Sequence, residues 1–132
     1  MVARVGRTVL VVEDDFSSLE VLVLLMRGAG LDVVSASDGE EAWAKLIAEP
    51  GIAIVVTDYM MPRLDGVGLC KRMQADPRFS ALPVILMSAT LRDRIENVPQ
   101  VVSVFVKPLL FDDLLAKVQS VLAKLAKGEP ET

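Results

Sequence analysis

The sequence of 132 residues contains no histidine and a single cysteine, Cys70. Without histidine, the chain lacks the base that Ser-His and Cys-His nucleophiles need, and it has no imidazole to bind a metal. A single cysteine excludes an intrachain disulfide, so the sequence gives no sign of an oxidising compartment.

The sequence also lacks an excess of positive charge and a long apolar run. Its net charge is −4, whereas a nucleic-acid-binding domain needs a basic face to meet phosphates. The positively charged residues 1–7 are followed by only a few apolar residues before Glu13, too few for a signal-peptide core or a membrane span. We therefore expect a cytoplasmic protein without a membrane span, whose domain binds no nucleic acid.

The sequence does contain enough apolar material for one folded unit. Hydrophobic residues make up 52% of the chain and charged residues 24%, a balance that argues against disorder. A chain of this length buries most of its surface without a disulfide or a structural metal. We expect a single domain over residues 1–132, with its core at about 7–126 and a frayed tail at 128–132.

Short apolar segments alternate with longer segments of helical period. Continuous runs rich in β-branched residues predict strands that are buried on both faces, as in a parallel sheet. Such runs lie at 8–12, 52–57 and 83–87, with weaker candidates at 31–35 and 103–106. Helices are predicted at 17–29, 38–49, 64–75 and 111–127, with a short one at 91–97. This alternation predicts an α/β fold with a parallel sheet and helices on both faces.

Polar residues follow four of the five predicted strands. Ligands of such sheets bind at the carboxyl ends of the strands, so we expect these residues to share one site. Carboxylates that converge there repel one another unless a hard cation lies among them, and oxygen ligands suit Mg²⁺, or Mn²⁺ in its place. The residues are Glu13-Asp-Asp15 after the first strand, Asp58 after the third, Ser88 after the fourth and Lys107 after the fifth.

These residue types suit attack by a carboxylate on a phosphoryl group. A metal and the ammonium of Lys107 would neutralise the phosphoryl oxygens, and the hydroxyl of Ser88 could donate to one of them. Each residue alone has an ordinary explanation, since Asp15 could be a helix N-cap and Lys107 a surface lysine before a turn. Their joint occurrence at four strand ends favours a functional site.

The motifs around these residues resemble the receiver domain of bacterial two-component response regulators, of the stand-alone chemotaxis type. The resemblance covers about residues 7–126. It implies a flavodoxin-like doubly wound sheet of five parallel strands in the order 2-1-3-4-5, with about five helices, the fourth short or irregular. The motifs are Val11-Val-Glu-Asp-Asp15, Thr57-Asp-Tyr-Met-Met-Pro-Arg-Leu-Asp-Gly66, Leu86-Met-Ser-Ala-Thr90 and Val106-Lys-Pro108.

The resemblance also implies a role for each residue of the predicted site. Asp58 would be the phosphoacceptor, and Mg²⁺ would be bound by Asp14, Asp15, Asp58 and the backbone carbonyl of Met60. Ser88 would be the switch hydroxyl, Lys107 would contact the phosphoryl group, and Pro108 would follow a cis peptide bond.

The implied partners are a phosphoryl donor and a target protein. The donor would be a phosphohistidine on a sensor histidine kinase or phosphotransfer protein. The output would be a changed contact with a downstream protein. The chain would then be no enzyme beyond a slow autophosphatase.

Two features depart from the family pattern, and a third position, Met60, is one at which family members vary. The position three residues before the lysine, where the family usually couples an aromatic side chain to the hydroxyl, is Val104. The segment between Ser88 and Lys107 is short, so the usual output face is in question. Met60, two residues after Asp58, is apolar and cannot orient an attacking water.

Three readings stay open. The first alternative to a phosphorylated receiver is an unphosphorylated pseudo-receiver scaffold. The second is a phosphatase with an aspartyl nucleophile, although such enzymes typically carry a second acid where this chain has Met60. A stand-alone receiver and part of a larger regulator are both compatible with the sequence.

Overall fold

Five parallel strands form one sheet in the order β2-β1-β3-β4-β5. The computed structural model describes residues 7–89 and 98–128. The fold class and the strand order predicted from the sequence are thus confirmed, and the arrangement is flavodoxin-like. The strands are β1 (Thr8–Val12), β2 (Asp32–Ala36), β3 (Ile52–Asp58), β4 (Val84–Ser88) and β5 (Val101–Val106).

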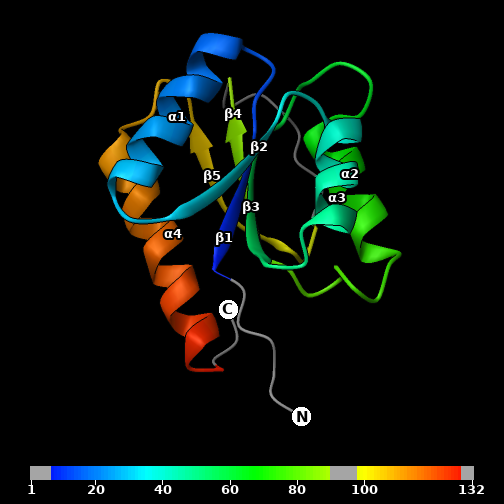
Figure 1. Ribbon diagram of the computed structural model, residues 1–132. Coiled ribbons are helices and arrows are strands. Elements are labelled where there is room, and N and C mark those ends of the chain that lie inside the picture. Colours follow the sequence, from blue (N-terminus) through cyan, green and yellow to red (C-terminus); the bar gives the residue numbers. More distant parts are fainter. Residues whose placement is uncertain (1–6, 90–97, 129–132) are drawn as a thin grey trace.

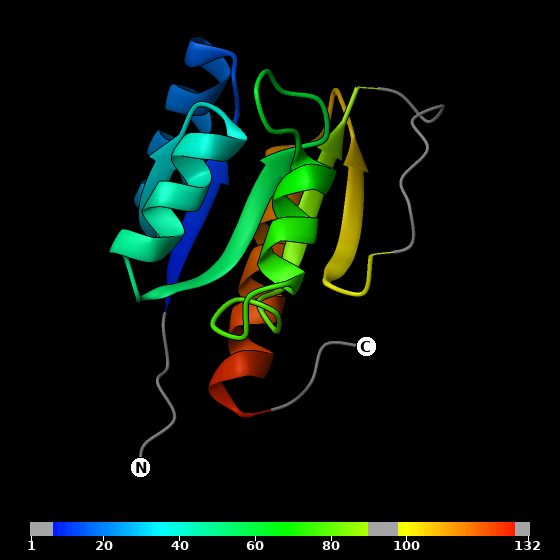
Figure 2. The same ribbon diagram turned by 90° about the vertical axis from the view of Figure 1, so that its right-hand side faces the viewer.

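Four helices pack on this sheet within the two described ranges. They are α1 (Phe16–Gly28), α2 (Gly39–Ala48), α3 (Gly66–Gln74) and α4 (Phe111–Ala126). Helices α1 and α4 cover one face of the sheet, and α2 and α3 cover the other (Figures 1 and 2). The predicted short helix at 91–97 and most of the predicted frayed tail lie outside the described residues. None of the four helices is long and apolar enough to cross a membrane.

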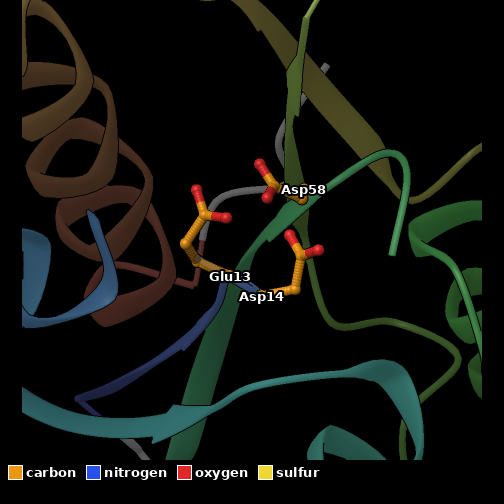
Figure 3. Close-up of side chains that lie close together, drawn as sticks. All are labelled: Glu13, Asp14 and Asp58. Atoms are coloured by element: carbon orange, nitrogen blue, oxygen red, sulfur yellow. The ribbon is translucent and has the colours of Figure 1, made fainter. Parts of the chain in front are cut away.

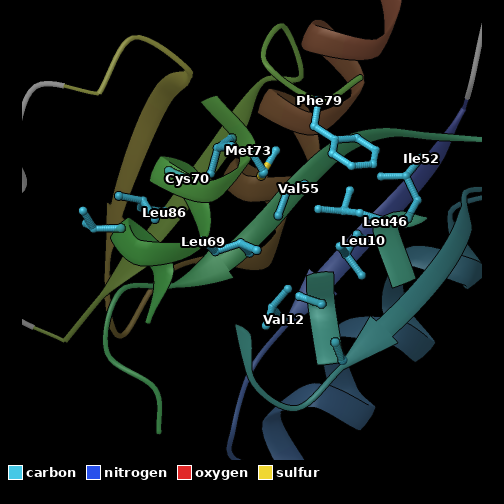
Figure 4. Close-up of a cluster of buried hydrophobic side chains, with 14 of the residues drawn as sticks. Leu10, Val12, Leu46, Ile52, Val55, Leu69, Cys70, Met73, Phe79 and Leu86 are labelled. Carbon is cyan, nitrogen blue, oxygen red and sulfur yellow. The ribbon is translucent and has the colours of Figure 1, made fainter. Parts of the chain in front are cut away.

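The alternation of side chains along the strands builds two hydrophobic cores. In β1, Leu10 and Val12 point to the face covered by α2 and α3 (Figure 4). Val9 and Val11 point to the face covered by α1 and α4. Because both faces are covered, every residue of β3 is buried, which is why the strand reads as a continuous apolar run.

Aspartates begin three of the four helices. The side chains of Asp15, Asp38 and Asp65 accept hydrogen bonds from the backbone N–H groups three residues further on. Such an N-cap stabilises a helix by about 1 kcal/mol. The caps start α1 and α2 directly after the carboxyl ends of β1 and β2, so the loops at this edge of the sheet are short and well defined.

Candidate functional site

Backbone hydrogen bonds extend the sheet by one residue past three strands and so fix the positions of the polar residues. The N–H of Glu13 donates to the carbonyl of Ala36 at 3.1 Å, and the N–H of Tyr59 to that of Met87 at 2.8 Å. The N–H of Lys107 donates to the carbonyl of Ser88 at 2.7 Å. The carboxyl ends of β1, β3, β4 and β5 therefore meet at one edge, as the sequence predicts.

Three carboxylates converge at this edge. Glu13, Asp14 and Asp58 each offer an oxygen within 4.8 Å of the others (Figure 3). Glu13 and Asp58 are buried, with 2% and 4% of their surface exposed, whereas Asp14 is exposed to solvent. Two acids of the cluster are therefore buried at the end of the sheet, and the third, Asp14, is accessible to solvent.

Lys107 bridges the two buried carboxylates. Its Nζ donates to Oε1 of Glu13 at 2.7 Å and lies 2.6 Å from Oδ1 of Asp58. The following bond, to Pro108, is cis, the isomer that the family resemblance implies. Ser88 lies at the end of β4 and is buried. Lys107 and Ser88 are therefore both at the edge where the acids converge.

The pKa values of the two buried acids are shifted in opposite directions. Burial and the hydrogen bond with Glu13 raise the pKa of Asp58 to about 8, although the contact with Lys107 opposes this increase. Burial opposes ionisation of Glu13 too, but hydrogen bonds with Asp58, Lys107 and the N–H of Asp15 outweigh it and lower the pKa to about 2. Burial also opposes the charge of Lys107, whose pKa is nevertheless raised by its hydrogen bonds with both acids. The metal-free pair therefore titrates as a unit, in which the pKa of Asp58 is raised and that of Glu13 is lowered.

The donor atoms fit a hard dication. Oδ1 of Asp58 is buried and lies 2.6 Å from the ammonium of Lys107. Three carboxylates that converge beside one ammonium leave negative charge uncompensated when they are ionised, and the repulsion is relieved by a further cation. Carboxylate oxygens in a group that retains access to water are what Mg²⁺ prefers, so the cluster suits this ion.

Asp15 is not part of this cluster. Its Oδ2 accepts hydrogen bonds from the N–H of Ser18 at 2.9 Å and from the hydroxyl of Ser18 at 2.6 Å, and its side chain points to solvent. These hydrogen bonds lower the pKa of Asp15, as expected for an N-cap. The sequence analysis named Asp15 as a ligand and not Glu13, whereas the structure brings Glu13 into the cluster.

A signal for Glu13 was present in the sequence. Because Glu13 still pairs with β2 through its N–H, its side chain continues the alternation of Val9 and Val11. Extending the alternation of β1 by one residue past Val12 therefore identifies Glu13 as the buried acid, whereas the Asp14-Asp15 pair does not.

Gly66 allows α3 to begin directly beside Asp58. A Cβ at this position would lie 2.3 Å from the backbone oxygen of Asp58, closer than any side-chain carbon is tolerated. The N–H of Gly66 donates to the carbonyl of Tyr59 at 2.9 Å and closes the intervening loop. The loop that contains Met60 is therefore anchored at both ends.

The side chains of Met60 and Val104 both reach solvent. The side chain of Met60 is 63% exposed, and Val104 on β5 is 42% exposed. Phe105 points to the opposite face of β5 and packs against the core beneath α1 and α4, so it does not replace the missing aromatic residue at position 104.

The sequence is similar to one known protein family and to several characterised proteins. The family model described as "Response regulator receiver domain" matches residues 9–119. A probable transcriptional regulator ycf27 from Porphyridium aerugineum is 34% identical over 123 residues, which are 91% of this chain and 50% of that protein. Chemotaxis protein CheY1 from Helicobacter pylori is 37% identical over 81 residues, 60% of this chain and 65% of that protein. The chain spans about half the length of the ycf27 proteins that it matches.

Solved structures agree with the sequence relatives. A response regulator receiver protein from Pseudomonas putida has a TM-score of 0.78 at 30% identity, covering 91% of this chain and 99% of that one. The receiver domain of the Francisella response regulator 1452 has a TM-score of 0.78 at 28% identity, with the same coverage. Both alignments include nearly all of the sheet and its helices.

Proposed function

The chain belongs to the family of response regulator receiver domains, and from this premise we propose that Asp58 accepts a phosphoryl group from a phosphohistidine in an Mg²⁺-dependent reaction. Members of this family are phosphoacceptors rather than catalytic enzymes, and membership implies a kinase as partner. The donor in this proposal is a sensor histidine kinase or a phosphotransfer protein in the cytoplasm. The observation that carries the proposal is the convergence of Glu13, Asp14 and Asp58 within 4.8 Å of one another, with the ammonium of Lys107 2.6 Å from Asp58.

The metal ligands in this proposal are Glu13, Asp14, Asp58 and the backbone carbonyl of Met60. We assign Asp15 to the cap of α1 instead, because its carboxylate is already engaged by Ser18. The bound ion would supply positive charge for the phosphoryl oxygens. It would also remove the proton from Asp58, because a metal ligand must be ionised.

The protein's own residues would perform the transfer. A carboxylate oxygen of Asp58 forms a bond to phosphorus as the bond from phosphorus to the imidazole nitrogen of the donor breaks. Lys107, already within 2.6 Å of Asp58, would pair with a phosphoryl oxygen, and the hydroxyl of Ser88 would donate to another. The attacking oxygen is held by β3, so little reorganisation is needed.

Output by changed protein contacts follows from where these two residues lie. Ser88 and Lys107 are joined by the backbone hydrogen bond between β4 and β5. A phosphoryl group that draws both side chains toward it would favour one arrangement of the following loops, and a downstream protein would bind that arrangement more tightly. Capture of a partner in the presence of beryllium fluoride, but not in its absence, tests this part.

Labelling of Asp58 by a small phosphodonor tests the central proposal. We expect acetyl phosphate and Mg²⁺ to add one phosphoryl group to the wild-type chain, located to Asp58 by peptide mass spectrometry after borohydride reduction. Chelation of Mg²⁺ and the Asp14→Asn variant should both suppress labelling. The exposed acid Asp112 provides the matched control, since Asp112→Asn should be labelled like the wild type. Equal labelling of Asp58→Asn would contradict the proposal.

A further inference from the structure

The loop between β3 and α3 contains an unusual backbone conformation. Arg63 has a φ of +68° and is the one non-glycine residue with positive φ among those described. A side chain with a Cβ disfavours this left-handed region, so the surrounding contacts must hold the residue there. The loop runs from Tyr59 to Asp65 and contains Met60.

A salt bridge to the start of α2 holds Arg63. Its Nε donates to Oδ2 of Asp38 at 3.0 Å, and Nη2 pairs with the same oxygen. The other oxygen of Asp38, Oδ1, accepts the N–H of Glu41 at 2.8 Å and caps α2. Asp38 is 6% exposed, so the guanidinium supplies charge to a carboxylate that water barely reaches.

A backbone contact one residue further on joins the same two elements. The N–H of Gly39 donates to the carbonyl of Leu64 at 3.0 Å. A Cβ at Gly39 would lie 2.1 Å from that oxygen, so the approach depends on glycine. The loop is thus joined to α2 by a side-chain contact and a backbone contact at adjacent positions.

A second arginine pair to α2 differs from this arrangement. Arg72 pairs with Glu40 between α3 and α2, and both side chains are substantially exposed. Exposed pairs of this kind contribute little to stability. The Arg63 pair differs because its acid is buried and its loop directly follows Asp58.

From these contacts we propose that Arg63 is a positioning residue for the metal site. By holding the loop against the N-terminus of α2, Arg63 would restrain the loop that carries the backbone carbonyl of Met60, one of the ligands that would hold Mg²⁺. Asp38 is its partner in this role, and together they set the affinity of the protein for Mg²⁺. This inference rests on the proposed function only in that it takes the acid cluster to be a Mg²⁺ site.

Direct measurement of Mg²⁺ binding by isothermal titration calorimetry tests the inference without requiring phosphorylation. Loss of a residue that orients a metal ligand typically weakens metal binding at least tenfold. We expect Arg63→Ala to raise the dissociation constant about tenfold. The labelling rate of Asp58 at saturating Mg²⁺ should stay close to that of the wild type, because Arg63 touches none of the reacting atoms.

Two further variants distinguish an effect of Arg63 on the Mg²⁺ ligands from an effect on the stability of the fold. Arg63→Gly adopts the positive φ without strain but lacks the guanidinium. It should therefore bind Mg²⁺ as weakly as Arg63→Ala does, but its thermal unfolding should occur at a higher temperature than that of Arg63→Ala. Asp38→Ser keeps a capping oxygen for α2 and loses only the partner of Arg63. The double variant Arg63→Ala, Asp38→Ser should bind no more weakly than either single variant, because both remove one interaction.

The matched control is Arg72→Ala, which also removes an arginine pair to α2 but leaves the loop untouched. It should bind Mg²⁺ like the wild type. Wild-type affinity in Arg63→Gly, or a loss in Arg72→Ala equal to that in Arg63→Ala, would overturn the inference. Absence of labelling in a wild type that binds Mg²⁺ would instead refute the proposed phosphoacceptor role and leave the inference about Arg63 standing.

Discussion

At the scale of single residues, burial decides the chemistry of the site. Asp58 and Glu13 lie on the same edge of the sheet, but burial raises the pKa of Asp58 to about 8 while hydrogen bonds lower that of Glu13 to about 2. Lys107 contacts both. The metal-free protein therefore favours a protonated Asp58, and this proton links its stability to pH.

The pH dependence of stability follows from the sign of that shift. Because the folded state binds the Asp58 proton more tightly than the unfolded chain, the stabilisation is complete below about pH 4 and is lost as the pH rises through about 8. The shift at Glu13 has the opposite sign, and its contribution is lost only as the pH falls toward about 2. In the presence of a chelator, the free energy of unfolding should thus fall between about pH 5 and 8.

Asp58→Asn tests this assignment because it keeps the shape and removes the titrating group. We expect urea unfolding of the variant to show little change between about pH 5 and 8. At pH 8 the variant should be more stable than the metal-free wild type by about 1–2 kcal/mol, a value discounted for the partial access of water to the site. A slope with pH equal to that of the wild type would locate the titrating group elsewhere.

Met60 controls a different property, the lifetime of the phosphorylated form. Its exposed side chain has no group that can orient or deprotonate a water near the phosphoryl group. We expect slow loss of the phosphoryl group from the wild type. Met60→Asn should shorten its lifetime by about tenfold, less than the roughly 10²–10⁴-fold effect of a positioned acid or base, because an amide can orient a water but not deprotonate it. The decay of labelled protein after removal of the donor measures this lifetime, and an unchanged lifetime in Met60→Asn would contradict the assignment.

At the scale of elements, most of the fold could be predicted because each element has a strong local signal. The strands are mostly apolar runs and three of the four described helices begin at capping aspartates, so the observed ends of the described elements differ from the predicted ends by at most two residues. The meeting of Asp14, Asp58, Ser88 and Lys107 at one edge was predicted from their positions after the carboxyl ends of parallel strands.

The contacts that could not be predicted depend on side-chain direction or on distant pairs. The choice between Glu13 and Asp15 depends on where β1 stops pairing, and Asp15 carried a strong capping signal of its own. The pair of Arg63 with Asp38 joins residues 25 positions apart, and neither residue type indicates that partner. Such contacts are fixed by how α2 and the following loop pack, which no local pattern encodes.

Helix α3 provides the prediction that belongs to this scale. A methyl group at Gly66 would meet the backbone oxygen of Asp58, whose backbone is held as the last residue of β3. Gly66→Ala should therefore destabilise the protein by about 1–3 kcal/mol, the range for an overpacked site. Chemical unfolding measures this loss. Gly28→Ala is the control, because a Cβ there meets nothing within 4 Å, and an equal loss in both variants would show that the close approach is unimportant.

At the scale of the whole molecule, the acid cluster lies at the edge of the sheet, between two separate hydrophobic cores. The core beneath α2 and α3 and the core beneath α1 and α4 share only the sheet itself. The acids of the cluster lie at the carboxyl ends of β1 and β3, two neighbouring strands in the interior of the sheet (Figure 3). An ion bound there is coupled to the global unfolding of the domain.

Mg²⁺ should therefore stabilise the entire domain. A ligand that binds only the folded state raises the free energy of unfolding by about 2.7 kcal/mol at a hundred times its dissociation constant. We expect the midpoint of thermal unfolding to rise with Mg²⁺ in the wild type. Asp14→Asn should reduce the increase, because it removes one ligand and leaves both cores intact. A midpoint that is independent of Mg²⁺ would show that the cluster does not bind the ion.

The raised pKa of Asp58 has a consequence for calorimetry. We expect the protein to release protons as it takes up Mg²⁺ near neutral pH, because the ligands of a metal have to be ionised. Uptake of the ion is thus an exchange reaction, and the surrounding buffer absorbs the released acid. The heat measured in Tris and in phosphate at the same pH should differ by the difference between their ionisation enthalpies.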